Sequence, residues 1–183
     1  IRHAVMQGYL PIFFTKSPNL FTDMYRDLKA INFENIHPFI INNGKDAQVK
    51  DAKGTVIFSP LGKEEQKSLL SEETEYPTDS PEAIAWYKTI GKSVPDPEKV
   101  PTTLVYETLD RMPLGYDMVF CTYSQIQSAH PYKRLWLEKM ISNGVEGSKK
   151  FKKVVFILDE SHMAGGYDSV SYTHLTLPTK RIV

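Results

Sequence analysis

Residues 154–162 read VVFILDESH, and this stretch decides the fold class. Its first five residues are all apolar, which is typical of a strand buried on both faces of a parallel sheet. We therefore expect a central strand over 154–158. Asp159 and Glu160 follow at its carboxyl end, and this is the edge at which open α/β sheets bind their ligands.

The N-terminal part of the chain alternates between helix and strand patterns. Residues 1–8 predict the end of a helix, and the apolar run 9–16 (YLPIFFTK) predicts a buried strand. Ser17 and Pro18 predict the start of the next helix, because serine caps helices and proline fits the first helical position. The expected apolar face of that helix consists of Phe21, Met24, Leu28 and Ile31. A second strand over 38–42 (PFIIN) completes an alternation that predicts an α/β domain with a mostly parallel sheet.

Residues 43–100 interrupt the alternation. Residues 47–50 and 55–58 flank a turn that contains Gly54, a pattern typical of a β-hairpin. The segment 61–82 is rich in Glu and Asp, and we interpret it as an acidic, solvated stretch. The whole of 43–100 is interpreted as a partly irregular surface insertion, not as a second domain.

Regular alternation resumes after the insertion. Residues 101–111 could form a helix that begins with proline, 116–122 (YDMVFCT) predict a strand, and 131–142 predict another helix. Cys121 lies inside the expected strand and is interpreted as a small core residue. Because it is the one cysteine of the chain, an internal disulfide and a Cys-based zinc site are excluded, and a reducing compartment is expected.

Composition narrows the possible partners. The 183 residues carry 22 Lys+Arg and 22 Asp+Glu, so the formal net charge is zero. The overall charge therefore does not indicate nucleic-acid binding, and such a partner must be argued from local features. No apolar run approaches the roughly 18 residues of a membrane span, and no signal-peptide pattern opens the chain. We expect a cytoplasmic protein without a membrane partner.

The adjacent carboxylates at the end of 154–158 suggest a specific chemistry. Ionised acids beside a buried strand are costly unless they are paired or bind a metal. In the Walker-B pattern the Asp holds Mg²⁺ and the next Glu polarises the water that attacks the γ-phosphate of a nucleotide. Asp159 and Glu160 are thus candidate metal ligands, and Glu160 is the candidate catalytic base. The alternative is an ordinary polar strand end before a helix. A hydrolytic triad of Asp159, Ser161 and His162 is disfavoured, because neighbouring residues cannot readily adopt its geometry.

Three segments in order resemble superfamily 2 helicases. Residues 154–162 resemble motif II in its DExH form, 14–18 (FTKSP) resemble the nucleic-acid-contacting motif Ia, and 116–125 (YDMVFCTYSQ) resemble the element near motif Ib. The chain is similar to the strawberry-notch-like helicases of phage or bacterial type in three segments, SPNLFTDMYRDLKAI, TYSQIQS and LDESHMAGG, and in having a hairpin insertion. The resemblance covers residues 1–169.

This resemblance implies a partial RecA-like domain of the P-loop NTPase class, with ATP and Mg²⁺ as cofactors, in a bacterial or phage-infected cell. It implies that Asp159 coordinates Mg²⁺, that Glu160 activates water, and that Ser161 and His162 couple the site to a second RecA-like domain of the parent chain. The implied nucleic-acid contacts, to DNA in preference to RNA, are Thr15, Lys16, Ser17, Thr122, Tyr123 and Ser124. Such phosphate contacts read position and not base sequence. The alternatives are a solvated strand end for Lys16 and a packing aromatic for Tyr123.

Two departures from the family pattern qualify the resemblance. A motor of this type needs a Gly-rich loop ending Gly-Lys-Ser/Thr; Gly91-Lys92-Ser93 lacks the preceding glycine and strand. Because the chain begins with Ile1, we expect a piece of a longer protein with the loop upstream, and an inactive isolated fragment.

Residues 170–183 (VSYTHLTLPTKRIV) resemble translated sequencing-adapter read-through and are expected to be non-native; a native strand over 171–177 is the alternative.

Two functions therefore remain open from the sequence. The first is an ATP-dependent helicase or translocase, of which this chain holds most of the first RecA-like domain. The second is a non-catalytic α/β module that binds nucleic acid or protein and carries a degenerate nucleotide site.

Overall fold

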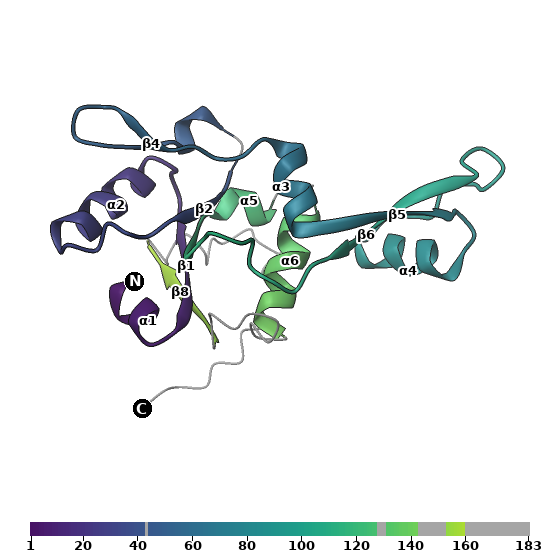
Figure 1. Ribbon diagram of the computed structural model, residues 1–183. Helices are drawn as coiled ribbons and strands as arrows, with labels where there is room; N and C mark the ends of the chain where they lie inside the picture. Colours follow the sequence, from purple (N-terminus) through teal and green to yellow (C-terminus); the bar gives the residue numbers. More distant parts are fainter. Residues whose placement is uncertain (43, 128–130, 143–152, 160–183) are drawn as a thin grey trace, which may run out of the picture.

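A parallel sheet forms the centre of the computed structural model, which describes residues 1–42, 44–127, 131–142 and 153–159 (Figure 1). Its strands lie in the order β2, β7, β1, β8 and are all parallel. Their bounds are Tyr9–Thr15 for β1, Pro38–Ile41 for β2, Met118–Thr122 for β7 and Lys153–Leu158 for β8. The prediction of an α/β domain with a mostly parallel sheet is confirmed.

Strand β1 occupies the interior position of this sheet that was expected for β8. It pairs with β7 through Ile12–Val119 and with β8 through Phe13–Ile157. Within the described ranges, β8 has β1 on one side and no strand on the other. Four of its apolar residues are half-buried, and Leu158 is 44% exposed. The prediction of a central strand over 154–158 was therefore wrong for this part of the chain. An apolar run reports contact on the two faces of a strand, whereas the chain topology decides its place in the sheet.

Helices cover both faces of the sheet. On one face, α1 (Arg2–Met6) and α2 (Leu20–Ala30) lie over side chains such as Phe13 and Phe120. On the other face, α5 (Tyr123–Gln127), α6 (Pro131–Ser142) and α3 (Lys63–Leu70) contact Ile12 and Phe14 or their neighbours. Because side chains alternate along a strand, each strand contributes to both cores.

Helix α2 begins later than its sequence predicts. Asn19 is the N-cap, and the carbonyls of Ser17 and Pro18 accept hydrogen bonds from the N–H groups of Leu20 and Phe21, at 3.2 and 3.0 Å. Ser17 and Pro18 therefore form the turn into the helix. The buried face also differs, since it consists of Phe21, Tyr25 and Leu28, whereas Ile31 follows the helix and is 47% exposed.

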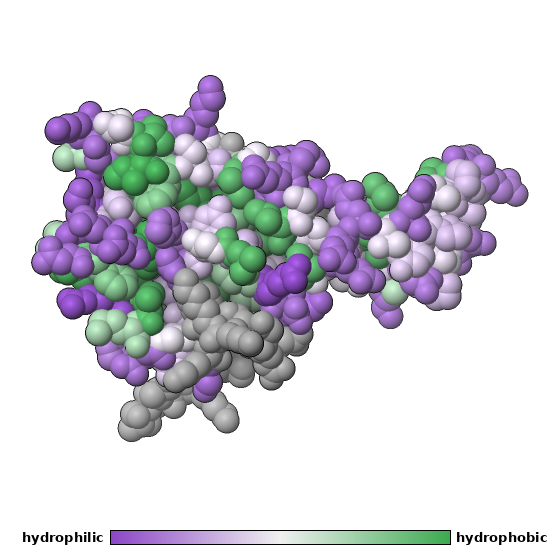
Figure 2. Space-filling model, viewed as in Figure 1, coloured by the Kyte–Doolittle hydropathy of each residue, from purple (hydrophilic) through white to green (hydrophobic). Residues whose placement is uncertain are grey.

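An arm of antiparallel strands extends away from the central sheet (Figure 1). It pairs β5 (Ser71–Pro77) with β6 (Thr102–Thr108) along their full length and carries α4 (Pro81–Thr89) against them. Figure 2 shows that hydrophilic residues dominate the visible surface of the arm. Its small apolar core is built on Ala83, Trp86 and Val105.

The arm corrects one prediction for the inserted region and adds detail to another. The stretch 61–82 is mostly exposed, as expected of an acidic, solvated stretch, and it includes α3 and β5. The helix expected over 101–111 is strand β6. The alternating pattern of β6 becomes a stable strand only through its distant partner β5, and no local pattern identifies that partner. The predicted first hairpin is confirmed: after the 3-10 turn η1 (Lys45–Ala47), β3 (Val49–Lys50) pairs with β4 (Val56–Phe58).

A buried glutamine attaches the base of the arm to the sheet. The Nε2 atom of Gln66, on α3, lies 3.2 Å from the carbonyl oxygen of Ile40, 2.8 Å from that of Asn42 and 2.9 Å from that of Leu61. The side chain is fully buried. One amide group therefore links α3 to the end of β2 and to the chain just before the helix.

We expect Gln66→Leu to lower the free energy of unfolding by about 2 kcal/mol, because buried carbonyls would lose their donor. The measurement is equilibrium unfolding in urea. Gln48→Leu is the matched control, since the Nε2 of Gln48 donates to Ser59 at the exposed surface (3.4 Å) and its loss is expected to cost less than about 0.5 kcal/mol. Equal stability of the two variants would contradict this role for Gln66.

Candidate functional site

Three strand ends meet at one edge of the sheet. In the register of β1 and β7, Thr15 lies opposite Thr122, and in that of β1 and β8, Phe14 lies opposite Leu158. The N–H of Asp159 then donates to the carbonyl of Phe14 at 2.9 Å, which continues the ladder by one residue. Residues from three distant segments of the sequence thus come together at the carboxyl ends of parallel strands.

The two threonines of this edge point toward the helix α2 side of the sheet. Thr15 and Thr122 follow Phe13 and Phe120 by two residues, and these phenylalanines belong to the core under α2. Both threonines are buried. The hydroxyl of Thr122 is 3.0 Å from that of Ser124, whereas the hydroxyl of Thr15 has no hydrogen-bond partner within the described part of the chain. Most buried polar side-chain atoms have a partner, so the hydroxyl of Thr15 is an exception at this edge.

Lys16 and Ser17 lead from β1 into helix α2. Lys16 is exposed and Ser17 is half-buried. They stand before the N-terminus of α2, where the helix dipole favours negative charge. This position suits a phosphate contact, and it equally suits the solvated strand end considered for Lys16.

The Thr-Tyr-Ser segment divides between surface and interior. Ser124 is exposed, but Tyr123 is only 8% exposed, and its ring stacks on Phe14 with centroids 6.1 Å apart. Its hydroxyl donates to the backbone carbonyl of Asp159 at 2.7 Å. This burial favours the packing alternative for Tyr123 over direct contact with nucleic acid.

Sequence reasoning missed a buried lysine behind this segment. Lys133, on α6, is 2% exposed, and its Nζ donates to Oε1 of Gln125 on α5 at 2.6 Å. Burial lowers the pKa of Lys133. The contact holds α6 against the turn that follows β7. No sequence signal distinguishes this lysine, because lysines on helices are usually exposed.

The described part of the acidic motif is compatible with magnesium. Asp159 is half-buried at the end of β8, whereas Glu160, Ser161 and His162 lie outside the described residues. Among the residues that the structure describes, no group of three His, Cys, Asp or Glu could hold a metal ion. Mg²⁺ is often bound through one or two carboxylates, with water and phosphate oxygens as its other ligands. Asp159 offers one carboxylate of this kind.

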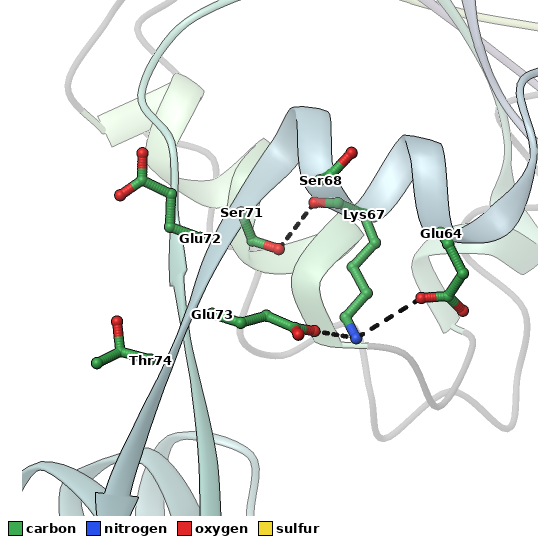
Figure 3. Close-up of a pocket in the computed structure, with 7 residues that line it drawn as sticks. All are labelled: Glu64, Lys67, Ser68, Ser71, Glu72, Glu73 and Thr74. Carbon is green, nitrogen blue, oxygen red and sulfur yellow. Dashed lines mark hydrogen bonds and ion pairs between the residues drawn. The ribbon is translucent and has the colours of Figure 1, made fainter.

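A separate hollow lies at the base of the arm (Figure 3). It has a volume of about 590 Å³ and is lined by Glu64, Lys67, Ser68, Ser71, Glu72, Glu73 and Thr74. Lys67 forms ion pairs with Glu73 and, at 3.9 Å, with Glu64, and its Nζ lies 4.5 Å from the ring centroid of Tyr106. The bond to Glu73 raises the pKa of Lys67, so this lysine stays charged. The hollow contains none of the predicted site residues, and its contacts join α3 to the arm.

The chain was compared with known protein families, curated proteins and solved structures. No protein-family model, curated protein or solved structure matches the chain. In the described ranges, no helix is both long and apolar enough to cross a membrane.

Replacing Thr15 by valine tests whether its hydroxyl is unpaired. We expect Thr15→Val to raise the free energy of unfolding by about 1 kcal/mol, because a methyl group replaces a buried hydroxyl without a partner. Thr122→Val is the matched control: it removes a paired hydroxyl from the neighbouring strand and should lower stability by about 1 kcal/mol. Urea unfolding measures both, and a loss of stability in Thr15→Val would show that its hydroxyl is bonded.

Cys121 gives a prediction with a defined pH dependence. The thiol is fully buried, and burial raises its pKa to about 12, so it is no candidate nucleophile. Below pH 9 the thiol is protonated in both the folded and the unfolded chain, and its contribution to stability is fully present. Between about pH 9 and 12 the unfolded thiol ionises while the folded one does not, so stability falls as the pH rises.

We therefore expect the wild-type chain to lose more stability than Cys121→Ala between pH 8 and pH 10.5, with a difference of roughly 2 kcal/mol. Urea unfolding at the two pH values measures it. A thiol reagent at pH 8 should label the native chain only as fast as it unfolds. Rapid labelling of the folded chain, or equal pH dependence in the two proteins, would contradict the burial of this thiol.

Proposed function

We propose that the chain is part of the first RecA-like domain of an ATP-dependent helicase or translocase, of the strawberry-notch-like kind. The observation that carries the proposal is the meeting of the ends of β1, β7 and β8 at one sheet edge. The resemblance divides the motor residues among these three segments. Their spatial juxtaposition is what a motor needs in order to link ATP hydrolysis to nucleic-acid contact.

Asp159 and Glu160 have the hydrolytic roles in this proposal. Asp159 would hold Mg²⁺, and the ion would supply charge that stabilises the transferred phosphoryl group. Glu160 accepts a proton from the attacking water, which requires an ionised carboxylate within hydrogen-bonding distance. Ser161 and His162 are proposed to couple this chemistry to the second RecA-like domain.

The nucleic-acid contacts in this proposal lie along the same edge. Lys16 supplies an exposed positive charge, and the N-terminus of α2 adds a favourable dipole. Ser124 offers an exposed hydroxyl after β7. Such groups bind phosphates without reading base sequence. The proposed ligand is DNA in preference to RNA. The half-buried Ser17 is a further candidate contact, whereas the burial of Thr15, Thr122 and Tyr123 disfavours direct contact with the nucleic acid.

The second candidate is a binding module with a degenerate nucleotide site. It is favoured by one observation, that the 183 residues contain no Gly-Lys-Ser/Thr loop after a strand. The coding sequence upstream of Ile1 separates the two functions. A phosphate-binding loop there supports the motor, and a start codon without one supports the binding module.

In the full-length protein, we expect Glu160→Gln and Asp159→Asn each to reduce DNA-stimulated ATP hydrolysis at least 100-fold, in line with the loss of a general base or of the metal ligand. Release of inorganic phosphate is the measurement. Glu82→Gln, an exposed carboxylate on α4, is the control and should hydrolyse ATP normally. Undiminished hydrolysis by Glu160→Gln would remove the assigned base.

Binding of DNA can be tested in the 183-residue chain itself. We expect Lys16→Ala to weaken binding of a single-stranded oligonucleotide several-fold and to reduce the slope of log K against log salt by about 0.7, the loss of one phosphate contact. Fluorescence anisotropy at several salt concentrations gives both values. Lys53→Ala, in the exposed turn between β3 and β4, should leave the slope unchanged. A slope that Lys16→Ala does not alter would leave Lys16 as a solvated strand end.

A further inference from the structure

Tyr123 occupies a buried position in a row of aromatic rings. Its ring stacks on Phe14 with an interplanar angle of 13°, and Phe14 stacks on Phe156 with centroids 5.6 Å apart. These residues come from the end of β7, from β1 and from β8, so the row crosses three adjacent strands. All three belong to the core on the α6 side of the sheet.

The hydroxyl of Tyr123 links two strands that are not neighbours. Adjacent strands lie about 4.8 Å apart, so β7 and β8 are separated by about 10 Å, with β1 between them. The Tyr123 side chain spans this distance and donates to the carbonyl of Asp159 at 2.7 Å. That carbonyl belongs to the peptide bond that follows Asp159. On its other side, the N–H of Asp159 is bonded to Phe14.

The residues on either side of Tyr123 have hydroxyls on the polar edge. Thr122 and Ser124 are bonded to each other at 3.0 Å, and Ser124 is exposed. A ligand that moves this segment therefore also moves the backbone that carries Tyr123. Because interiors are closely packed, such a shift is transmitted through the stacked rings and the hydroxyl to Asp159.

We propose that Tyr123 is a positioning residue that couples nucleic-acid contact at the exposed Ser124, whose hydroxyl is bonded to the buried Thr122, to the backbone of Asp159. The inference rests on the proposed function and adds the route by which nucleic acid stimulates hydrolysis. Packing needs only the aromatic ring, which phenylalanine also provides. The coupling needs the hydroxyl, which phenylalanine lacks, and this difference makes the role testable.

The experiment compares Tyr123→Phe with Tyr87→Phe in the full-length protein. Tyr87, on α4, is the matched control, because its hydroxyl makes one 3.0 Å bond to Thr103 within the arm. The measurements are ATP hydrolysis with and without a single-stranded DNA oligonucleotide, and the dissociation constant of that oligonucleotide. We expect the ratio of stimulated to unstimulated hydrolysis to fall at least about fivefold in Tyr123→Phe and to stay at the wild-type value in Tyr87→Phe. The dissociation constant should change by less than about twofold.

Hydrogen exchange in the 183-residue chain provides a second readout that needs no hydrolysis. Tyr123→Phe should speed exchange of the Asp159 amide, whereas Tyr87→Phe should not, because only the first releases the Asp159 backbone. A wild-type stimulation ratio in Tyr123→Phe, or unchanged exchange at Asp159, overturns the coupling and leaves the proposed function standing. Weakened DNA binding with a normal ratio overturns it as well and makes Tyr123 a contact residue. A wild-type protein that DNA does not stimulate overturns the proposed function itself.

Discussion

The burial of β1 is the constraint on which the rest of the structure depends. Six of its seven residues are buried, so it needs a strand on each side and a helical layer over each face. Strands β7 and β8 pair with β1 on its two sides, and the cores under α2 and α6 cover its two faces. A parallel arrangement satisfies these demands, and it also makes the three strands end at the same edge.

The candidate site follows from that shared direction. Parallel strands end together, so the residues after each apolar run meet although they are far apart in the sequence. The aromatic layer adds a second connection beneath the polar edge, since Phe14 contacts a ring from each neighbouring strand. The residues of the edge are therefore packed directly against the core under it. Thr15 and Tyr123 are both buried at this edge, on opposite faces of the sheet.

Sequence predicted the elements whose signals are local. Local apolar patterns predicted β1, β2, β7 and α6, because burial of a face requires periodic apolar residues. Strand β6 could not be predicted in this way, since its stability comes from a partner about 30 residues away in the chain. At the site, sequence predicted Thr15 and Asp159 as candidates and left Tyr123 open between a contact and a packing role, and it did not predict the burial of Lys133. Those features depend on which helix covers which face, and no local pattern records that choice.

The neutral composition is compatible with a nucleic-acid partner once charge is divided between arm and body. Residues 71–108 carry eight acidic and three basic side chains, so the other residues carry 14 acidic and 19 basic ones. The excess outside the arm is five positive charges, and it is still three when the two basic residues of 170–183 are left out. Phosphate binding depends on local positive charge and not on the total, because interactions beyond about 10 Å are screened. In the proposed function, a phosphate backbone would therefore bind the body, which carries the positive excess, and not the acidic arm.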